Sequence, residues 1–298
     1  HTDGVTALTV AVQGGHMETT KILLEAGALV EVADEDGMTP VLHAVKGNFG
    51  AIATYLVENG ANPTGEFVDD KGTKHNLLLD AITVSNVDFV KLLLEKGSDV
   101  SVTDERGVTP LIQAAYQGLV DVVVELLKYP KTDVNAASLE GFNPLIAASS
   151  EGHNEIVDLL LATKKVRVND ADNDGTNALM NASVRGHKKV VEALIAAGCA
   201  VNKQNVDGHT ALMFAYNGKN QVQTLMDKYA EYMKNGDDDS TKLMNDALQT
   251  HLDVISALRA AGADTNIKDN EGHTTADFDY KPPEAAPGGI TQGQYSEL

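Results

Sequence analysis

Three acidic residues in one short segment have the spacing of a calcium-binding loop. Asp170, Asp172 and Asp174 alternate along the chain and Gly175 follows them, as at the start of an EF-hand loop. The twelfth position of such a loop would be Asn181, where calcium geometry calls for a bidentate glutamate. Asp174-Gly175 also belongs to a pattern that recurs along the chain. The segment is therefore predicted to be a turn, and no metal or cofactor is predicted.

The other residues that could do chemistry are dispersed. His153, His187 and His251 recur at corresponding positions of the pattern, so they are predicted to bond loop carbonyls rather than to form a metal cluster. Cys199 is the single cysteine, cannot form an internal disulfide, and is predicted to be a structural thiol. The sequence contains no Cys-x-x-Cys pair, phosphate-binding glycine loop or nucleophile elbow. These observations argue against an enzyme.

A periodic glycine dominates the sequence. It follows an acidic or other polar residue at Gly4, Gly37, Gly72, Gly107, Gly141, Gly175, Gly208 and Gly272. The spacings are 33, 35, 35, 34, 34, 33 and 64 residues. A fixed period in this range indicates a stacked solenoid, in which each unit buries its apolar face against its neighbours. Such proteins present surfaces for binding.

The residues that recur within each repeat are similar to those of a known family. The sequence reads G-V-T-P-L-I-Q-A-A-Y-Q-G from Gly107, G-F-N-P-L-I-A-A-S-S-E-G-H from Gly141 and G-T-N-A-L-M-N-A-S-V-R-G-H from Gly175. This closely resembles the ankyrin repeat, whose pattern is D-G-x-T-P-L-H-x-A-A, then G-H, an apolar helix and G-A-D-V-N. The resemblance covers about residues 1–278 apart from one insertion. It implies a β-turn tip, two antiparallel helices and a loop per repeat, with a binding surface formed by the tips and first helices.

The local chemistry predicts the same elements. Thr39, Thr109 and Asn143 each precede a proline, so their side chains are expected to cap the first amides of a helix that begins with that proline. The second helices carry apolar residues at helical spacing. They are expected to end at left-handed glycines, namely Gly27, Gly60, Gly97, Gly198 and Gly262. The prediction is an all-α ankyrin-repeat solenoid of seven repeats plus a partial eighth, over residues 1–280, and a Pro/Gly-containing tail over residues 281–298.

Some positions depart from the family pattern. The histidine that follows T-P-L in the family is replaced by Thr9, Leu42, Ile112, Ile146, Met180 and Met213. Apolar packing is expected to substitute for the hydrogen bonds of that imidazole. The third repeat has two extra residues before its first helix (His75–Ile82), which predicts a longer tip.

The charge balance restricts the partners. The chain has 23 basic and 43 acidic residues and a net charge of −20, which disfavours DNA or RNA binding because phosphate contacts require cations. Tips are rich in acid, including Asp36, Asp104, Glu105, Glu140 and Asp174, and stacked tips would align these carboxylates along one edge. Two explanations remain open. Aspartate favours turns through local bonds to the backbone, or the acidic edge steers a basic partner.

The long last spacing places an insertion at Asn220–Thr250. Val222, Leu225, Met226, Tyr229, Tyr232 and Met233 have helical spacing. Asn235-Gly236 is expected to break this helix, and Asp237–Ser240 offers N-caps for a second one. The segment is predicted to be a helical hairpin that extends the two helices of repeat seven. It is either packed on itself or a knob that docks a partner through Tyr229, Tyr232 and Met233.

The ends and the compartment are less informative. No run of eighteen apolar residues occurs, so no direct membrane insertion is expected. The chain begins at His1 with no polar end repeat, and further repeats, another domain or a removed targeting segment are expected upstream. One cysteine favours a reducing compartment. Cytoplasm or nucleus is the prediction, and an organelle interior remains open if a targeting segment has been removed.

These features predict a non-catalytic scaffold or adaptor that binds a partner protein through its concave side and the turn tips, and the partner has a basic surface if the acidic edge steers it. The alternatives are a permanent subunit of a large assembly, or the substrate-recruiting or regulatory region of an enzyme with an upstream catalytic domain. Aromatic side chains are the expected anchors. The predicted contacts on the tips and outward helix positions are His43, Lys46, Asp104, Glu105, Gln113, Tyr116, Gln117, Asn181, Arg185 and Phe214.

Overall fold

The chain folds into stacked helix pairs. Its structure, a computed structural model, describes residues 4–68, 74–229 and 238–279. Within these residues seven helix pairs and one two-stranded hairpin are present, which confirms the predicted all-α repeat architecture. The first helices of the pairs are α1 (Ala7–Gln13), α3 (Pro40–Lys46), α5 (Leu77–Thr83), α7 (Pro110–Gln117), α9 (Pro144–Glu151), α11 (Ala178–Val184) and α13 (Ala211–Lys228). The second helices are α2 (Met17–Glu25), α4 (Gly50–Glu58), α6 (Val87–Glu95), α8 (Val120–Leu126), α10 (Asn154–Ala162), α12 (Lys188–Ala196) and α15 (Asp238–Ala260).

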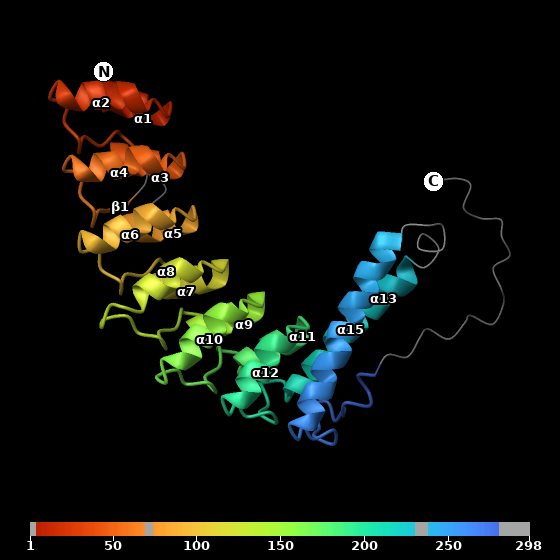
Figure 1. The fold of residues 1–298 in the computed structure, drawn as a ribbon. Coiled ribbons are helices and arrows are strands. Elements are labelled where there is room, and N and C mark those ends of the chain that lie inside the picture. The colour runs from red at the N-terminus through yellow and green to blue at the C-terminus, as the bar shows by residue number, and fades with distance from the viewer. Residues whose placement is uncertain (1–3, 69–73, 230–237, 280–298) are drawn as a thin grey trace, which may run out of the picture.

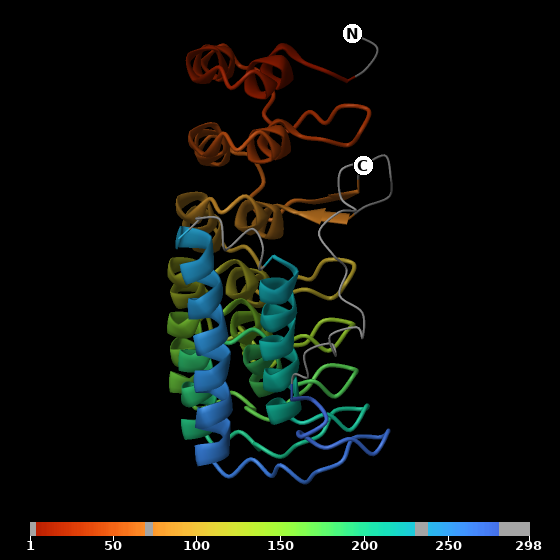
Figure 2. The same ribbon diagram turned by 90° about the vertical axis from the view of Figure 1, so that its right-hand side faces the viewer.

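The pairs form a curved solenoid with two distinct edges. Figure 1 shows the pairs stacked from the N-terminus to α13 and α15, which are longer than the other helices and project beyond them. In Figure 2 the tips lie along one edge, the first helices run down the middle and the second helices form the opposite edge. The tips and the outward side of the first helices together are called the concave face below.

Most first helices begin as predicted. The side chain of Thr109 accepts a hydrogen bond from the Ile112 amide (3.2 Å), and that of Asn143 accepts one from the Ile146 amide (2.8 Å). The prediction for Thr39 is wrong in one respect, because its side chain makes no capping bond. The amide of Leu42 bonds the backbone carbonyl of Thr39 instead (3.1 Å).

The core is continuous along the stack. One cluster of buried apolar residues extends from Leu8 in the first helix pair to Leu258 in α15. The six residues that replace the family histidine are all buried. Five of them are apolar, as expected if apolar packing substitutes for its hydrogen bonds, whereas the hydroxyl of Thr9 bonds Thr6. The five glycines expected to end the second helices all have positive φ, between 85° and 100°, so this prediction is confirmed.

The third tip is longer than the others, as predicted. Strands β1 (Glu66–Val68) and β2 (Lys74–Asn76) pair in antiparallel fashion, with Phe67 opposite His75. Asp69 and Asp70, two carboxylates of the expected acidic edge, lie outside the described residues.

The insertion lengthens both helices of its pair, as predicted. Helix α13 has 18 residues and α15 has 23, and they contact each other. Helix α15 begins at Asp238, so Asp239 and Ser240 lie within its first turn rather than before it. Residues 230–237, with the predicted contacts Tyr232 and Met233, lie outside the described residues, as does the predicted tail at 281–298.

Candidate partner-binding surface

The predicted contact residues fall on tips and first helices, but their surroundings differ. Gln113 and Tyr116 on α7 line an open pocket, and Lys46 on α3 is exposed. Others, including His43 and Arg185, bond to neighbouring residues of the chain. The structure therefore divides the predicted set into open and engaged positions.

The pocket lies between the fourth and fifth helix pairs. Its volume is about 310 Å³, which is at the lower end of the range for ligand sites and enough for one side chain. Apolar and aromatic groups predominate among its lining residues, which are Arg106, Val108, Ile112, Gln113, Tyr116, Ser138, Glu140, Phe142 and Ala147.

One of the lining residues occupies a repeat position whose side-chain size varies along the chain. This position lies six residues after the tip glycine in most repeats and holds Val10, His43, Asp80, Gln113, Ala147, Asn181, Phe214 and Phe278. Ala147 is the smallest of the eight, and it is one of the lining residues of the pocket. Sequence reasoning overlooked Ala147 because a single alanine carries no feature that indicates a binding site. Comparing side-chain volume across aligned repeats would have found it.

The rim of the pocket carries one charge of each sign. The guanidinium of Arg106 is paired with Asp104 in its own tip, with 3.3 Å between Nε and Oδ2. Glu140 is exposed, and no ion pair engages its carboxylate within the part of the chain that the structure describes. The rim therefore leaves a carboxylate available to a partner.

Backbone hydrogen bonds connect consecutive tips from the fourth repeat onward. The amides of Leu139, Asn173, Val206 and Asn270 donate to the carbonyls of Arg106, Glu140, Asp174 and Asp207 at 2.8–3.0 Å. The side chains of Glu140, Asp174, Asp207 and Glu271 are exposed at equivalent positions of these tips. From the fifth tip onward, exposed carboxylates thus stand on consecutive tips that backbone hydrogen bonds connect.

A second group of tip carboxylates has a structural role. Oδ1 of Asp104 accepts bonds from the amides of Arg106 (2.9 Å) and Val108 (2.8 Å). Asp172 does the same for Asp174 and Thr176, so the segment resembling a calcium loop is a tip turn. The contact role of Asp104 and Glu105 stays a prediction, but a substitution of Asp104 would also disturb its turn.

Several predicted contacts are engaged within the chain. Nε2 of His43 lies 2.6 Å from Oδ2 of Asp34, a residue that sequence reasoning overlooked. Burial acts to raise the pKa of Asp34, but the bonds from His43 and the Met38 amide hold it below its usual value. Arg185 pairs with Glu151 at 3.0 Å. The side-chain amides of Gln117 and Asn181 donate to the carbonyls of Thr83 (3.1 Å) and Asn177 (3.2 Å).

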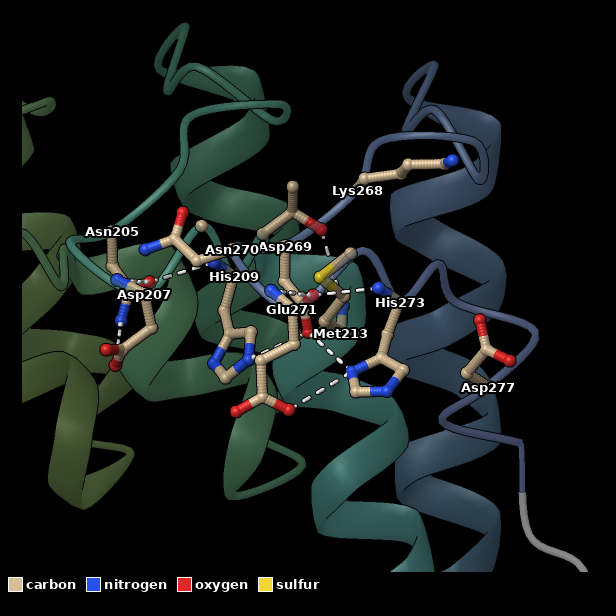
Figure 3. Close-up of polar contacts among 12 residues, drawn as sticks. Asn205, Asp207, His209, Met213, Lys268, Asp269, Asn270, Glu271, His273 and Asp277 are labelled. Carbon is tan, nitrogen blue, oxygen red and sulfur yellow. Dashed lines mark hydrogen bonds and ion pairs between the residues drawn. The ribbon is translucent and has the colours of Figure 1, made fainter.

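Polar contacts at the last tip centre on Asp269, which lies between His209 and His273 (Figure 3). Oδ2 of Asp269 is 3.4 Å from Nε2 of His209 and 3.3 Å from Nδ1 of His273. Desolvation acts to raise the pKa of Asp269, but the amides of His273 and Glu271 and the His273 ring hold it below its usual value. The His209 ring contacts Phe214 and Phe278 edge-on, with centroids 6.0 and 5.5 Å apart. Phe214 is therefore partly covered by its own chain.

Three histidines bond carbonyls of the preceding repeat: His153 and His187, which precede α10 and α12, and His251 within α15. Nε2 of His153, His187 and His251 lies 3.0–3.1 Å from the carbonyl oxygens of Tyr116, Ser150 and Val184. The predicted carbonyl bonds are present, but the carbonyls belong to the last turns of α7, α9 and α11 rather than to loops. No group of three or more potential metal ligands occurs in the described ranges.

Cys199 is buried, and burial raises the pKa of its thiol to about 11. Such a thiol has very little thiolate at neutral pH, and the thiolate is the reactive form. This position therefore favours the structural role predicted for the cysteine.

The projecting part of α13 and α15 exposes apolar side chains. Leu225 and Tyr229 on α13 are 48% and 39% exposed, and Leu243 on α15 is 71% exposed. Among the described residues, no helix is long and apolar enough to cross a membrane.

Comparison with known proteins places these observations in context. A family model described as ankyrin repeats (3 copies) matches residues 1–67, 66–138, 126–205 and 145–236. An ankyrin repeat and KH domain-containing protein from Caenorhabditis briggsae is 29% identical over 42% of this chain and 6% of its own length. The B-cell lymphoma 3 protein homolog of Mus musculus is 30% identical, over 41% of this chain and 26% of its own. The human ankyrin repeat and SOCS box protein 3 is 31% identical, over 40% and 22%. The match covers about a quarter of the length of these relatives or less.

Proposed function

The chain belongs to the ankyrin-repeat family, and on that premise we propose that it is a non-catalytic scaffold or adaptor that holds a partner protein against its concave face. Ankyrin repeats generally mediate protein–protein interaction. The observation that carries the proposal is the pocket at Ala147, because it is a concave site with apolar walls and a few polar groups at its rim.

The binding unit is proposed to be the solenoid of residues 1–280, with residues 281–298 as a separate tail. Gln113 and Tyr116 are the proposed central contacts, because they line the pocket and the Tyr116 side chain is 53% exposed. Tyrosine combines a large apolar surface with a polar end, which suits an interface anchor. Lys46 extends the same surface toward the N-terminus.

The partner is proposed to be a protein with a basic surface rather than a nucleic acid. The exposed carboxylates of Glu140, Asp174, Asp207 and Glu271 line one edge of the concave face, and the net charge is −20. A row of one sign accelerates association with an oppositely charged partner and repels phosphate.

A second contact surface is proposed on the projecting hairpin, where Tyr229 lies beside the exposed Leu225 and Leu243 marks the facing helix. Exposed apolar side chains grouped on one element are typical of a binding site. They favour the alternative function, in which the chain is a permanent subunit of a larger assembly and this hairpin is covered by a neighbour.

Site-specific photo-crosslinking distinguishes these surfaces. A photoreactive phenylalanine analogue is placed at Tyr116, at Leu243, or at Glu192 on the exposed side of α12 as a control, and the chain is expressed in its native cells. The proposal expects covalent adducts from the Tyr116 position and none from Glu192. Adducts from Leu243 alone would favour the permanent subunit, and equal adducts from all three positions would contradict a defined concave site.

A further inference from the structure

We propose that the pocket at Ala147 takes one apolar side chain from an extended basic segment of the partner. This inference rests on the proposed concave-face binding and specifies its chemistry. Four of the pocket walls are the side chains of Val108, Ile112, Phe142 and Ala147, which offer apolar surface and no charge. A side chain that fills such a space gains most when it is apolar itself.

The chain itself shows what fills the equivalent space elsewhere. At the last tip the position aligned with Ala147 is Phe278, and the position aligned with Val108 is His209. The two rings are in edge-on contact, with centroids 5.5 Å apart. At the last tip the residue aligned with Ala147 therefore places a phenyl group against the residue aligned with Val108. At position 147 the side chain is a methyl group that is itself buried, and the pocket lies beside it.

The charge around the pocket sets the character of the flanking residues. Arg106 is paired with Asp104 at 3.3 Å, whereas Glu140, which also lines the pocket, has no ion pair among the described residues. Asp174 and Asp207 follow on the next tips, and their spacing is fixed by the tip-to-tip backbone bonds. A segment that enters the pocket and continues along these tips would meet carboxylates, so its own charges should be positive.

The spacing of the tips predicts the spacing of those charges. Neighbouring helices pack about 8–10 Å apart, and an extended chain rises about 3.3 Å per residue. One repeat therefore corresponds to about three residues of an extended segment. The expected motif is an apolar residue with a cation at about every third position on one side of it.

Designed peptides test the motif directly. A fluorescein-labelled Gly/Ser peptide carries one leucine and then an arginine at every third position, and a second peptide carries glycine in place of the leucine. Both are made in both sequence directions, and binding to the full chain is measured by fluorescence anisotropy. In its preferred direction, the leucine peptide is expected to bind at least about 10-fold more tightly than the glycine peptide. Burying a leucine side chain is worth that factor or more.

Substitutions in the pocket assign the effect. Ala147→Phe introduces the residue that the chain itself has at the aligned positions 214 and 278, and it should abolish the preference for leucine, whereas Ala147→Ser should retain it. Val108→Phe, which copies the aligned Phe142, narrows the pocket from its other wall and replaces Ala147→Phe if that variant unfolds. Glu140→Gln should weaken both peptides by the same factor, because it removes charge and leaves the pocket intact.

Three results would overturn the inference. A leucine preference that survives Ala147→Phe and Val108→Phe would place the anchor elsewhere. Equal binding of a peptide with glutamate in place of arginine would reject the basic segment. Failure of every peptide to bind would reject the motif, whereas adducts of the native partner at Tyr116 would still support concave-face binding.

Discussion

The N-terminal and C-terminal interfaces between repeats share their apolar packing but differ in their polar connections. Between the fourth and seventh helix pairs, His153, His187 and His251 each bond a carbonyl of the preceding repeat. At the three earlier interfaces the aligned residues are Phe49, Asn86 and Leu119. Phe49 packs on Gly15, where an added Cβ would lie 2.7 Å from its ring. At the interface between the first and second repeats, a ring contact of Phe49 therefore takes the place of the imidazole–carbonyl hydrogen bond.

One position of the loops that follow the second helices shows a similar contrast, although the Ser98 hydroxyl also donates to the Pro63 carbonyl between the third and second repeats (2.7 Å). Asn135, Asn169 and Asn202 accept bonds from amides of the next loop at 2.7–2.9 Å. The aligned residues in the first three repeats are Glu31, Thr64 and Ser101, of which Glu31 accepts such a bond, from the Asn62 amide at 2.7 Å. Because a solenoid is stabilised through its neighbour interfaces, the C-terminal repeats should be coupled more strongly than the N-terminal ones.

Two equally buried leucines offer the strongest test of this difference. Leu56 on α4 and Leu160 on α10 are aligned, and both are fully buried. Replacing either with alanine should cost about 2–5 kcal/mol, because each leaves a cavity between packed helices. Urea denaturation followed by circular dichroism should show an early, separate transition for Leu56→Ala. Leu160→Ala should instead lower the midpoint of the main transition. Identical curves for the two variants would contradict unequal coupling.

A reciprocal exchange isolates the imidazole bond. His187→Phe removes the partner of the Ser150 carbonyl and should destabilise the protein by about 1–3 kcal/mol, the usual cost of an unsatisfied buried polar group. Phe49→His introduces the C-terminal residue at an N-terminal interface and should cost less, or stabilise it if the imidazole reaches a carbonyl. Both are measured as changes in the free energy of unfolding. Equal losses would show that ring volume matters rather than the hydrogen bond.

Repetition explains which features the sequence could predict. The helix-ending glycines, the capping residues Thr109 and Asn143, and the histidine–carbonyl bonds each depend on a few neighbouring residues that recur in register. The pocket at Ala147 does not, because it depends on the relative size of side chains in adjacent repeats. Phe214 was predicted to be an anchor on its local pattern alone. The ring that contacts Phe214 is His209, which is itself in contact with Phe278. Phe278 comes 64 residues after Phe214, so this arrangement depends on the fold of the last tip.

The stability of the interface around His187 should also depend on pH, with a smaller effect than the substitutions above. Burial in the interface lowers the pKa of His187 from the ordinary value of 6.5, with nearby Arg185 acting in the same direction. Above pH 6.5 the imidazole is neutral in both the folded and unfolded states, so its contribution to stability is complete. As pH falls below 6.5 the unfolded state takes up the proton first, and this contribution decreases until the folded pKa is reached. The free energy of unfolding should therefore decrease more between pH 7.5 and 5.5 for the wild type than for His187→Phe. Parallel profiles would mean that His187 titrates alike in both states.

Thiol labelling compares local opening in the two halves of the solenoid with substitutions that change the packing very little. Cys199 and Ala61 are aligned, immediately after the glycines that end α12 and α4, and both are buried. A double variant with Ala61→Cys and Cys199→Ala moves the single thiol to the N-terminal half. The native thiol has a pKa of about 11, so labelling by a thiol reagent at neutral pH requires local opening that exposes it to solvent. When reclosing is faster than labelling, the rate follows the population of the open state. The thiol at position 61 should then react faster by about tenfold for every 1.4 kcal/mol by which the N-terminal repeats open more easily.

Labelling in urea, where both chains are unfolded, controls for intrinsic reactivity. Equal rates in the native state would mean that the histidine, asparagine and tip bonds do not make the C-terminal repeats more resistant to opening.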